Sequence, residues 1–400
     1  MENKLNLSNK QSTTIIWTLL MVMPLLGMTI DLIAPSLPAI SSQLNISDSL
    51  AKETFTTFLF GFAFGNFFAG FISDAYGRRN ILRIGLFLFS MISIVPVLFP
   101  QINVLLMSRF IQGITMGMSA IVVRAAFSDI VPKEKLVHLG AVIGMMWGLG
   151  PVIGPLIGSY LQENFGWQSC FYFFSILSLL NFISVFFIVP ETHFNRQPLK
   201  FKTIQRNMLE VLKSRTFIAL PIMMGMSYSL ILSFHTMAPF FIQDMLHHSP
   251  VFFGKIALLL GISYVTTTIV VKKLLRHFLA SQILSTSIIF FLATTIIGLI
   301  LSYFYPNSVI LLVIMSTMMF IASGFIFLLS LGSGLAMFGH IIGTATAIMY
   351  LINGGLNATI SFIVSITHIN NLTTIIWVYV LLMSAITIVY FSLYKPQQST

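Results

Sequence analysis

The sequence contains few charged residues. Only 8% of its 400 residues are charged, whereas soluble proteins average about 25%, and 56% of its residues are hydrophobic. A helix that crosses a bilayer needs about 20 mostly apolar residues. The composition therefore predicts a membrane protein with many spans. It excludes a soluble nucleic-acid-binding domain, a secreted domain held by disulfides and an enzyme with a single anchor.

The sequence also lacks the residue clusters that bind metals and nucleotides. Cys170 is its one cysteine, so neither an intrachain disulfide nor a thiolate cluster can form. Its histidines include no His-x-x-x-His pair, which disfavours a metalloenzyme. The dipeptide Gly254-Lys255 lacks the glycine spacing and the hydroxyl residue of a phosphate-binding loop. We therefore expect no metal site, no cofactor and no use of nucleotide hydrolysis.

Apolar runs separated by short breaks predict twelve spans. The first run is too long for a signal peptide and ends without a cleavage site, so we expect it to be retained. A polar stretch at 191–215 divides these spans and is expected to be a linker. It separates an N-terminal six-helix bundle at 1–190 from a C-terminal six-helix bundle at 216–400. The sequence thus predicts an all-α membrane fold made of two repeats. The runs cover 14–38, 53–73, 80–99, 102–124, 138–161, 168–190, 217–243, 252–271, 280–304, 308–330, 340–366 and 372–394.

The basic residues indicate the orientation of the spans. If the N-terminus is cytoplasmic, 17 of the 21 lysines and arginines fall in cytoplasmic segments, as the positive-inside rule requires. This pattern accounts for the net charge of +10 and predicts a multi-pass protein of an inner membrane with both termini in the cytoplasm. For the basic linker two interpretations have equal weight. It is either an amphipathic helix that lies on the anionic leaflet or a solvated tether.

A turn rich in glycine and arginine follows the second predicted span. It reads Gly70-Phe-Ile-Ser-Asp74-Ala-Tyr-Gly77-Arg78-Arg79. Gly70 lets a neighbouring helix approach, and Gly77 suits a tight turn. Asp74 offers a carboxylate to the arginines or to a helix N-terminus. We interpret the turn as a conformational latch, with a chance basic turn as the alternative.

One aspartate and one arginine are predicted to lie deep within spans. Asp31 is in the first span and Arg109 in the fourth, and the helical rise of about 1.5 Å per residue places both in the outer half of the bilayer. An ion pair between them favours the charged carboxylate, whereas burial favours the protonated one. We therefore predict a proton-coupling site at Asp31 and Arg109. A static ion pair that fixes helix packing is the alternative.

The fifth predicted span combines glycines with two prolines. Prolines bend a helix, and glycines on one face permit close packing, here expected against a helix of the other half. We interpret this span as a gate helix, with an ordinary kinked helix as the alternative. Its candidate residues are Gly148, Gly150, Pro151, Gly154, Pro155 and Gly158.

These motifs resemble those of the major facilitator superfamily. The turn resembles its signature Gly-x-x-x-Asp-Arg/Lys-x-Gly-Arg-Arg/Lys, except at Ala75. The fourth span is similar to its Arg-x-x-x-Gly-x-x-x-Gly signature, and the fifth to the antiporter signature of drug:proton exporters. Three further segments resemble the Bcr/CflA-like branch of twelve-span drug:proton antiporters: Ile30-Asp31-Leu-Ile-Ala-Pro35-Ser-Leu-Pro38, Pro190-Glu191-Thr192 and Gly343-Thr-Ala-Thr-Ala. The resemblance implies the major facilitator fold and export driven by inward proton flow.

Several polar residues within spans are candidates for a substrate cavity. Tyr228 and His235 are seven apart, and Asn353 and Asn357 are four apart, so each pair shares a helix face. Gln112 lies one turn from Arg109. Hydrogen bonding between helices is the alternative role for such residues.

Together these features predict a proton-coupled secondary transporter that works by alternating access, and the resemblance implies that it exports varied drugs or amphiphilic small molecules. We expect a monomer in a lipid bilayer that takes a small-molecule substrate and no nucleic acid. One alternative is a dedicated exporter or importer of a single metabolite such as a siderophore or an amino acid. A membrane-embedded enzyme is a remote alternative, because the sequence shows no catalytic cluster.

Overall fold

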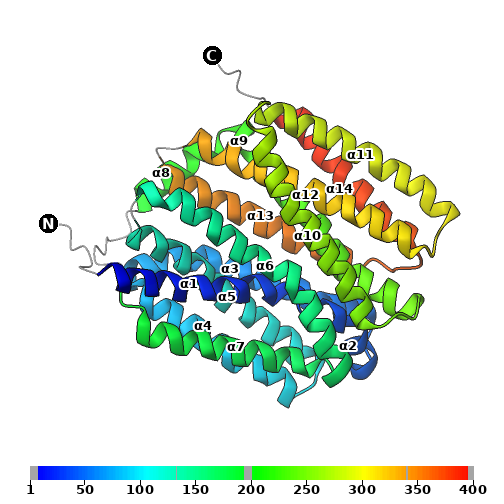
Figure 1. The fold of residues 1–400 in the computed structure, drawn as a ribbon, viewed down its shortest axis with the longest axis horizontal. Coiled ribbons are helices and arrows are strands. Elements are labelled where there is room, and N and C mark those ends of the chain that lie inside the picture. The colour runs from blue at the N-terminus through cyan, green and yellow to red at the C-terminus, as the bar shows by residue number, and fades with distance from the viewer. Residues whose placement is uncertain (1–7, 132, 193–200, 339–340, 395–400) are drawn as a thin grey trace. The chain divides into compact units, whose positions relative to one another are not determined.

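The structure is a computed structural model that describes residues 8–131, 133–192, 201–338 and 341–394. These residues form helices joined by short connections (Figure 1). The elements are α1 (Asn9–Asp31), the 3-10 helix η1 (Ala34–Ser36), α2 (Leu37–Leu44), α3 (Asp48–Tyr76), α4 (Arg78–Leu98), α5 (Ile102–Ile130), α6 (Lys133–Phe165), α7 (Gln168–Ile188), α8 (Phe201–Leu212), α9 (Arg215–Phe240), the π-helix η2 (Phe241–Met245), α10 (Pro250–Leu274), α11 (Ala280–Phe304), α12 (Val309–Met337), α13 (Ile342–Ser365) and α14 (Leu372–Leu393).

Most of these helices have the length and composition of membrane spans. In the described part of the chain, ten segments are long and apolar enough to cross a bilayer, the first of them combining α1, η1 and α2. Helices α3 and α6 lie at the second and fifth predicted spans and have 29 and 33 residues. The predicted all-α membrane fold is confirmed.

The chain divides into two compact units. The first comprises Met1–Ser47 and Thr57–Leu199, and the second comprises Asp48–Thr56 and Lys200–Thr400. The first turns of α3 thus pack with the second unit, although most of that helix belongs to the first. The predicted domain boundaries at 190 and 216 stay a prediction.

The two units repeat the same packing pattern. In the first unit α1 packs on α5, α6 and α7, and α4 packs on α5 and α7 (Figure 1). In the second unit α9 packs on α12, α13 and α14, and α11 packs on α12 and α14. Helix for helix, α1 corresponds to α9 and α4 to α11. This correspondence is the internal repeat expected of a transporter with two parallel halves.

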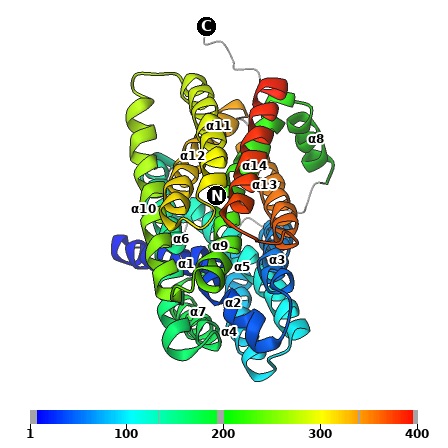
Figure 2. The same cartoon turned by 90° about the vertical axis from the view of Figure 1, so that its right-hand side faces the viewer.

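The linker contains a helix. Helix α8 packs on α9 and α13, and Figure 2 shows it at the side of α13. Val211 is buried in this contact, whereas Leu209 and Leu212 are exposed. The structure therefore shows a helix in the linker, whereas its position on the anionic leaflet stays a prediction, and residues 193–200 lie outside the described residues.

Candidate functional site

The first span is interrupted immediately after Asp31. Helix α1 ends at Asp31, and the chain continues through η1 and α2, each of which has a proline in its first two positions. Proline has no backbone N–H and disfavours helical geometry in the residue before it, so Pro35 and Pro38 account for the interruption. A helix that ends inside the protein leaves up to four carbonyls without a helical partner.

Arg109 of α5 satisfies one of these carbonyls. Its Nη2 donates to the carbonyl oxygen of Thr29 at 3.0 Å, and its Nη1 donates to Oε1 of Gln112 at 2.9 Å. Its guanidinium also lies 4.3 Å from the ring centroid of Phe58. A cation at a helix C-terminus is favourable because the last carbonyls carry partial negative charge. Arg109 therefore caps the broken end of α1.

Both ionisable residues at this helix end are buried away from solvent. Asp31 and Arg109 are each 0% exposed, and Asp31 lies two residues beyond the carbonyl that Arg109 binds. The structure thus brings the two predicted residues to the same helix end. A direct ion pair between their side chains stays a prediction.

Gln112 positions the arginine. Its Nε2 donates to Oγ of Ser93 on α4 at 2.9 Å, while its Oε1 accepts from Arg109. The residue is fully buried. Its amide therefore connects α4 to α5 and orients the guanidinium, a role that the periodicity of the sequence does not reveal. The predicted place of Gln112 in a substrate cavity stays a prediction.

Glycines of α5 place Arg109 close to α3. A Cβ at Gly113 would collide with the carbonyl oxygen of Phe58, and a Cβ at Gly117 would collide with that of Phe62. The absence of side chains at these two positions lets the backbones approach closely. This explains why Arg109, one turn before Gly113, lies over the ring of Phe58.

The glycines of α6 pack against α1. A Cβ at Gly150 would collide with Gly27, and one at Gly158 with the carbonyl of Leu32. Gly154 makes ordinary contact with Leu32, while no described residue lies within 4 Å of a Cβ at Gly148. The expectation that this glycine face meets a helix of the other half was therefore wrong for Gly150 and Gly158. Both glycines face the end of α1 in the same unit, where only a position without a Cβ lets the two backbones approach closely.

The prolines do not end α6. Pro151 and Pro155 both lie inside this helix, which continues from Lys133 to Phe165. Each proline removes one backbone hydrogen bond, and they occupy the stretch that packs on α1. The predicted gate role of the helix stays a prediction.

The predicted latch contains an interaction that the sequence motif does not include. Gly77 has a φ of +96° and is the N-cap of α4. The carboxylate of Glu191 accepts from the backbone N–H of Arg78 at 2.9 Å and of Arg79 at 3.3 Å. A Cβ at Gly77 would collide with this carboxylate. Glu191 therefore caps α4, where the positive end of the helix dipole favours an anion.

Arg78 adds an ion pair to the contacts of Glu191 at the start of α4. Its Nε lies 2.9 Å from Oδ2 of Asp129, near the end of α5. The same carboxylate oxygen accepts from Oγ1 of Thr192 at 3.1 Å. Sequence reasoning noted Glu191 and Thr192 only through the family resemblance and missed Asp129. Asp129 could have been found in the sequence as a carboxylate at the end of a span that is predicted to lie on the same side of the membrane as the basic turn. Of Gly70 and Asp74, the structure describes only the backbone, which lies in α3.

Replacing the Glu191 carboxylate should destabilise the first unit. In Glu191→Gln we expect a loss of about 1 kcal/mol, typical of a lost helix cap, and a fall in melting temperature of about 2–4 °C, as for a unit of 150–250 residues. Thermal unfolding of the purified protein measures this. Glu163→Gln, at an exposed position near the end of α6, is the control. Equal melting temperatures for the two variants would contradict the capping role.

The cavity candidates in the second unit differ in exposure. His235 is fully buried, with the Phe320 ring of α12 at 5.9 Å. Asn357 accepts a hydrogen bond from Oγ of Ser229 at 3.0 Å, which is the interhelical role weighed as its alternative. Tyr228 and Asn353 are half-buried. The ring of Tyr228 lies 6.1 Å from that of Phe327. Their place in a substrate cavity stays a prediction.

A buried lysine caps a helix end in the second unit. Lys52, in the first turns of α3, is 1% exposed and donates from Nζ to the carbonyl of Thr367 at 2.9 Å, just after α13. It also lies 5.2 Å from the ring centroid of Phe240. One turn along, Thr56 hydrogen-bonds to Ser361 of α13 at 3.0 Å. The second predicted span begins directly after Lys52, and hydropathy does not indicate that a lysine at a span end is buried.

Comparison with solved structures shows the same fold. The chain matches a D-xylose-proton symporter with a TM-score of 0.77 over 97% of this chain and 98% of the symporter, at 18% identity. It matches the inward-open xylose transporter XylE from E. coli with a TM-score of 0.73 over 97% and 98% of the two chains, at 16% identity. At such identities the likeness concerns the fold alone.

Sequence relatives come from several bacteria. The chain is 32% identical over 213 residues to a bicyclomycin resistance protein homolog of Haemophilus influenzae, covering 52% of this chain and 53% of that protein. It is 30% identical over 217 residues to the multidrug resistance protein MdtL of Vibrio parahaemolyticus, covering 54% of each. The chain thus spans little more than half the length of these two relatives.

The family is established by a longer match. Residues 19–361 match the model of the Major Facilitator Superfamily. The match includes the break after Asp31, the Arg109 cap and the Gly77 turn, and the two repeated units have the fold of solved superfamily transporters. This chain belongs to the Major Facilitator Superfamily.

Proposed function

We propose that this protein is a proton-coupled exporter of varied drugs or amphiphilic small molecules. The observation that carries the proposal is the burial of Asp31 and Arg109 at the broken end of α1. Ionisable groups inside a membrane are costly, and they mark ion or proton pathways by default. Relatives named for multidrug and bicyclomycin resistance support the substrate class.

In the proposed cycle Asp31 exchanges a proton for the substrate. Arg109 is held by the Thr29 carbonyl and by Gln112, so its charge is fixed beside the end of α1 while the charge of Asp31 changes. Loss or gain of that proton changes the electrostatic free energy of the helix end and thereby favours one orientation of the two bundles. A proton that moves down 100 mV releases about 2.3 kcal/mol, enough for roughly fifty-fold accumulation of substrate per proton.

The other candidate residues have supporting roles in this proposal. The Gly77 turn with Arg78, Asp129 and Glu191 acts as the latch that holds the start of α4. Helix α6, whose glycines seat the end of α1, acts as the gate. The protein works as a monomer in an inner membrane with both termini cytoplasmic, uses the proton gradient as its energy source and requires no cofactor.

A cell-based efflux assay tests this function. Cells without their own exporters that express the protein should accumulate less of several unrelated fluorescent dyes, and should tolerate more bicyclomycin, than cells with an empty vector. A protonophore should abolish the difference. Protection against a single compound would favour a dedicated exporter, and higher accumulation would favour an importer. No difference for any compound would contradict export.

A further inference from the structure

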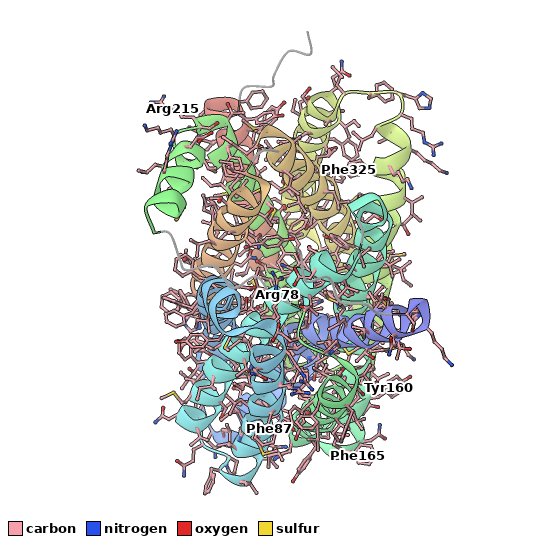
Figure 3. All side chains as sticks on the ribbon, turned by 90° about the vertical axis from the view of Figure 1, so that its left-hand side faces the viewer. Arg78, Phe87, Tyr160, Phe165, Arg215 and Phe325 are labelled. Atoms are coloured by element: carbon pink, nitrogen blue, oxygen red, sulfur yellow. The ribbon has the colours of Figure 1, made fainter. Side chains whose placement is uncertain are left out.

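A groove between α4 and α7 lies on the outside of the first unit. Its volume is about 420 Å³, and three phenylalanines form much of its wall. The ring centroids of Phe87 and Phe182 are 5.3 Å apart, and those of Phe182 and Phe186 are 5.8 Å apart. Figure 3 labels Phe87 and Arg78 on α4, the helix that borders the groove. The lining residues are Asn80, Arg83, Ile84, Phe87, Phe182 and Phe186.

Two arginines meet at one end of this groove. Arg79 and Arg83 are four residues apart on α4, and each donates a hydrogen bond to the carbonyl of Phe186, Arg79 at 3.5 Å. Like charges at this spacing destabilise a helix. The guanidinium of Arg83 also lies 4.3 Å from the ring centroid of Phe186. The end of α7 thus brings two positive charges together at a single carbonyl.

Among the side chains that the structure describes, these two charges have no acidic partner, unlike their neighbour Arg78. Arg78 forms an ion pair with Asp129. Within the described residues no carboxylate bonds the guanidinium of Arg79 or Arg83, and the Nε of each has no hydrogen-bond partner. The nearby Glu191 binds backbone N–H groups instead. Both arginines remain partly exposed, so a ligand with negative charge can reach them.

If depth is measured from the start of α4, taken as the membrane surface, the basic end of the groove lies at the level of the lipid headgroups. Arg83 is five residues beyond the start of α4, about 7.5 Å along the helix at 1.5 Å per residue. The polar region of each leaflet is roughly 5–7 Å thick. Beyond Arg83 the groove continues along Ile84 and Phe87, which are 48% and 41% exposed. A basic end at headgroup depth thus leads into an apolar groove at the depth of the acyl chains.

From this geometry we infer that the α4/α7 groove binds an anionic phospholipid. The phosphate accepts hydrogen bonds from Arg79 and Arg83, and one acyl chain lies along Ile84, Phe87 and Phe182. Basic pockets between membrane helices bind anionic headgroups in this way. A free inorganic anion fits less well, because it leaves the apolar two-thirds of the lining without a partner. The inference does not depend on what the protein transports.

Native mass spectrometry of the purified full-length protein tests the site. We would titrate it with dihexanoyl phosphatidylglycerol, with dihexanoyl phosphatidylcholine and with inorganic phosphate. Phosphatidylglycerol should bind in preference to the other two. The double variant Arg79→Gln/Arg83→Gln should weaken its binding at least about tenfold, since each basic residue contributes to anionic lipid binding. The control Lys272→Gln/Lys273→Gln removes two exposed charges from the end of α10 and should leave binding unchanged.

Three outcomes would overturn the inference: equal binding of the two lipids, equal binding of inorganic phosphate, or equal weakening by the two double variants. If the arginine variant does not fold, Ile84→Glu gives a second test. It places a negative charge at an exposed position of the groove and should weaken phosphatidylglycerol binding without changing phosphatidylcholine binding. Unchanged phosphatidylglycerol binding in a folded Ile84→Glu protein would also contradict the site.

Discussion

Asp31→Asn should abolish substrate accumulation driven by a pH gradient. Asparagine keeps the size of the side chain but cannot exchange a proton, so the cycle loses its driving force. In proteoliposomes with a gradient of one pH unit, exchange of one proton supports accumulation of about tenfold, because one unit corresponds to about 1.4 kcal/mol. We expect the native protein to approach this ratio and the variant to reach equal concentrations on both sides.

The control for this experiment is Asp48→Asn, at the exposed start of α3, which should accumulate substrate like the native protein. Asp31 is fully buried, so thermal unfolding must show that Asp31→Asn is folded. If the folded variant still accumulates substrate in response to the gradient, Asp31 is not the coupling residue. Asp31 then belongs to a static contact that fixes the end of α1.

Gly158→Ala should destabilise the protein, and Gly148→Ala on the same helix should not. A Cβ at Gly158 collides with the carbonyl of Leu32, whereas a Cβ at Gly148 meets no atom of the part of the chain that the structure describes within 4 Å. Overpacking of this kind costs about 1–3 kcal/mol. At Gly148, by contrast, alanine improves helix propensity by up to about 1 kcal/mol. We therefore expect shifts of opposite sign in the melting temperatures of the purified proteins.

The same pair of variants also tests whether α6 seats the coupling residue. Leu32 follows Asp31 directly, so displacement of Leu32 by Gly158→Ala moves the end of α1 away from Arg109. We expect transport driven by the pH gradient to fall in Gly158→Ala and to stay unchanged in Gly148→Ala. If Gly158→Ala transports normally with an unchanged melting temperature, the close contact between α1 and α6 does not position the site.

Much of the site was predictable because its motifs consist of residues that are close together in the sequence. The turn at Gly77 and the buried Arg109 follow from the sequence, since a glycine before two arginines suits a turn and an arginine in an apolar run needs a partner. The partners themselves were not predictable. Glu191 is more than a hundred residues from Arg78, and the carbonyl that Arg109 binds belongs to the backbone of Thr29, which has no sequence signature.

The sequence by itself determined the membrane class, the spans and the repeated halves, because each depends on how apolar and charged residues alternate along the chain. Only the tertiary structure decided which groups meet: Gly158 with Leu32, Arg109 with Thr29, and Arg79 and Arg83 with Phe186. The physical reason is that apolarity decides whether a helix enters the membrane, whereas contacts between helices depend on local shape, on carbonyls left open where a helix ends and on positions without a side chain.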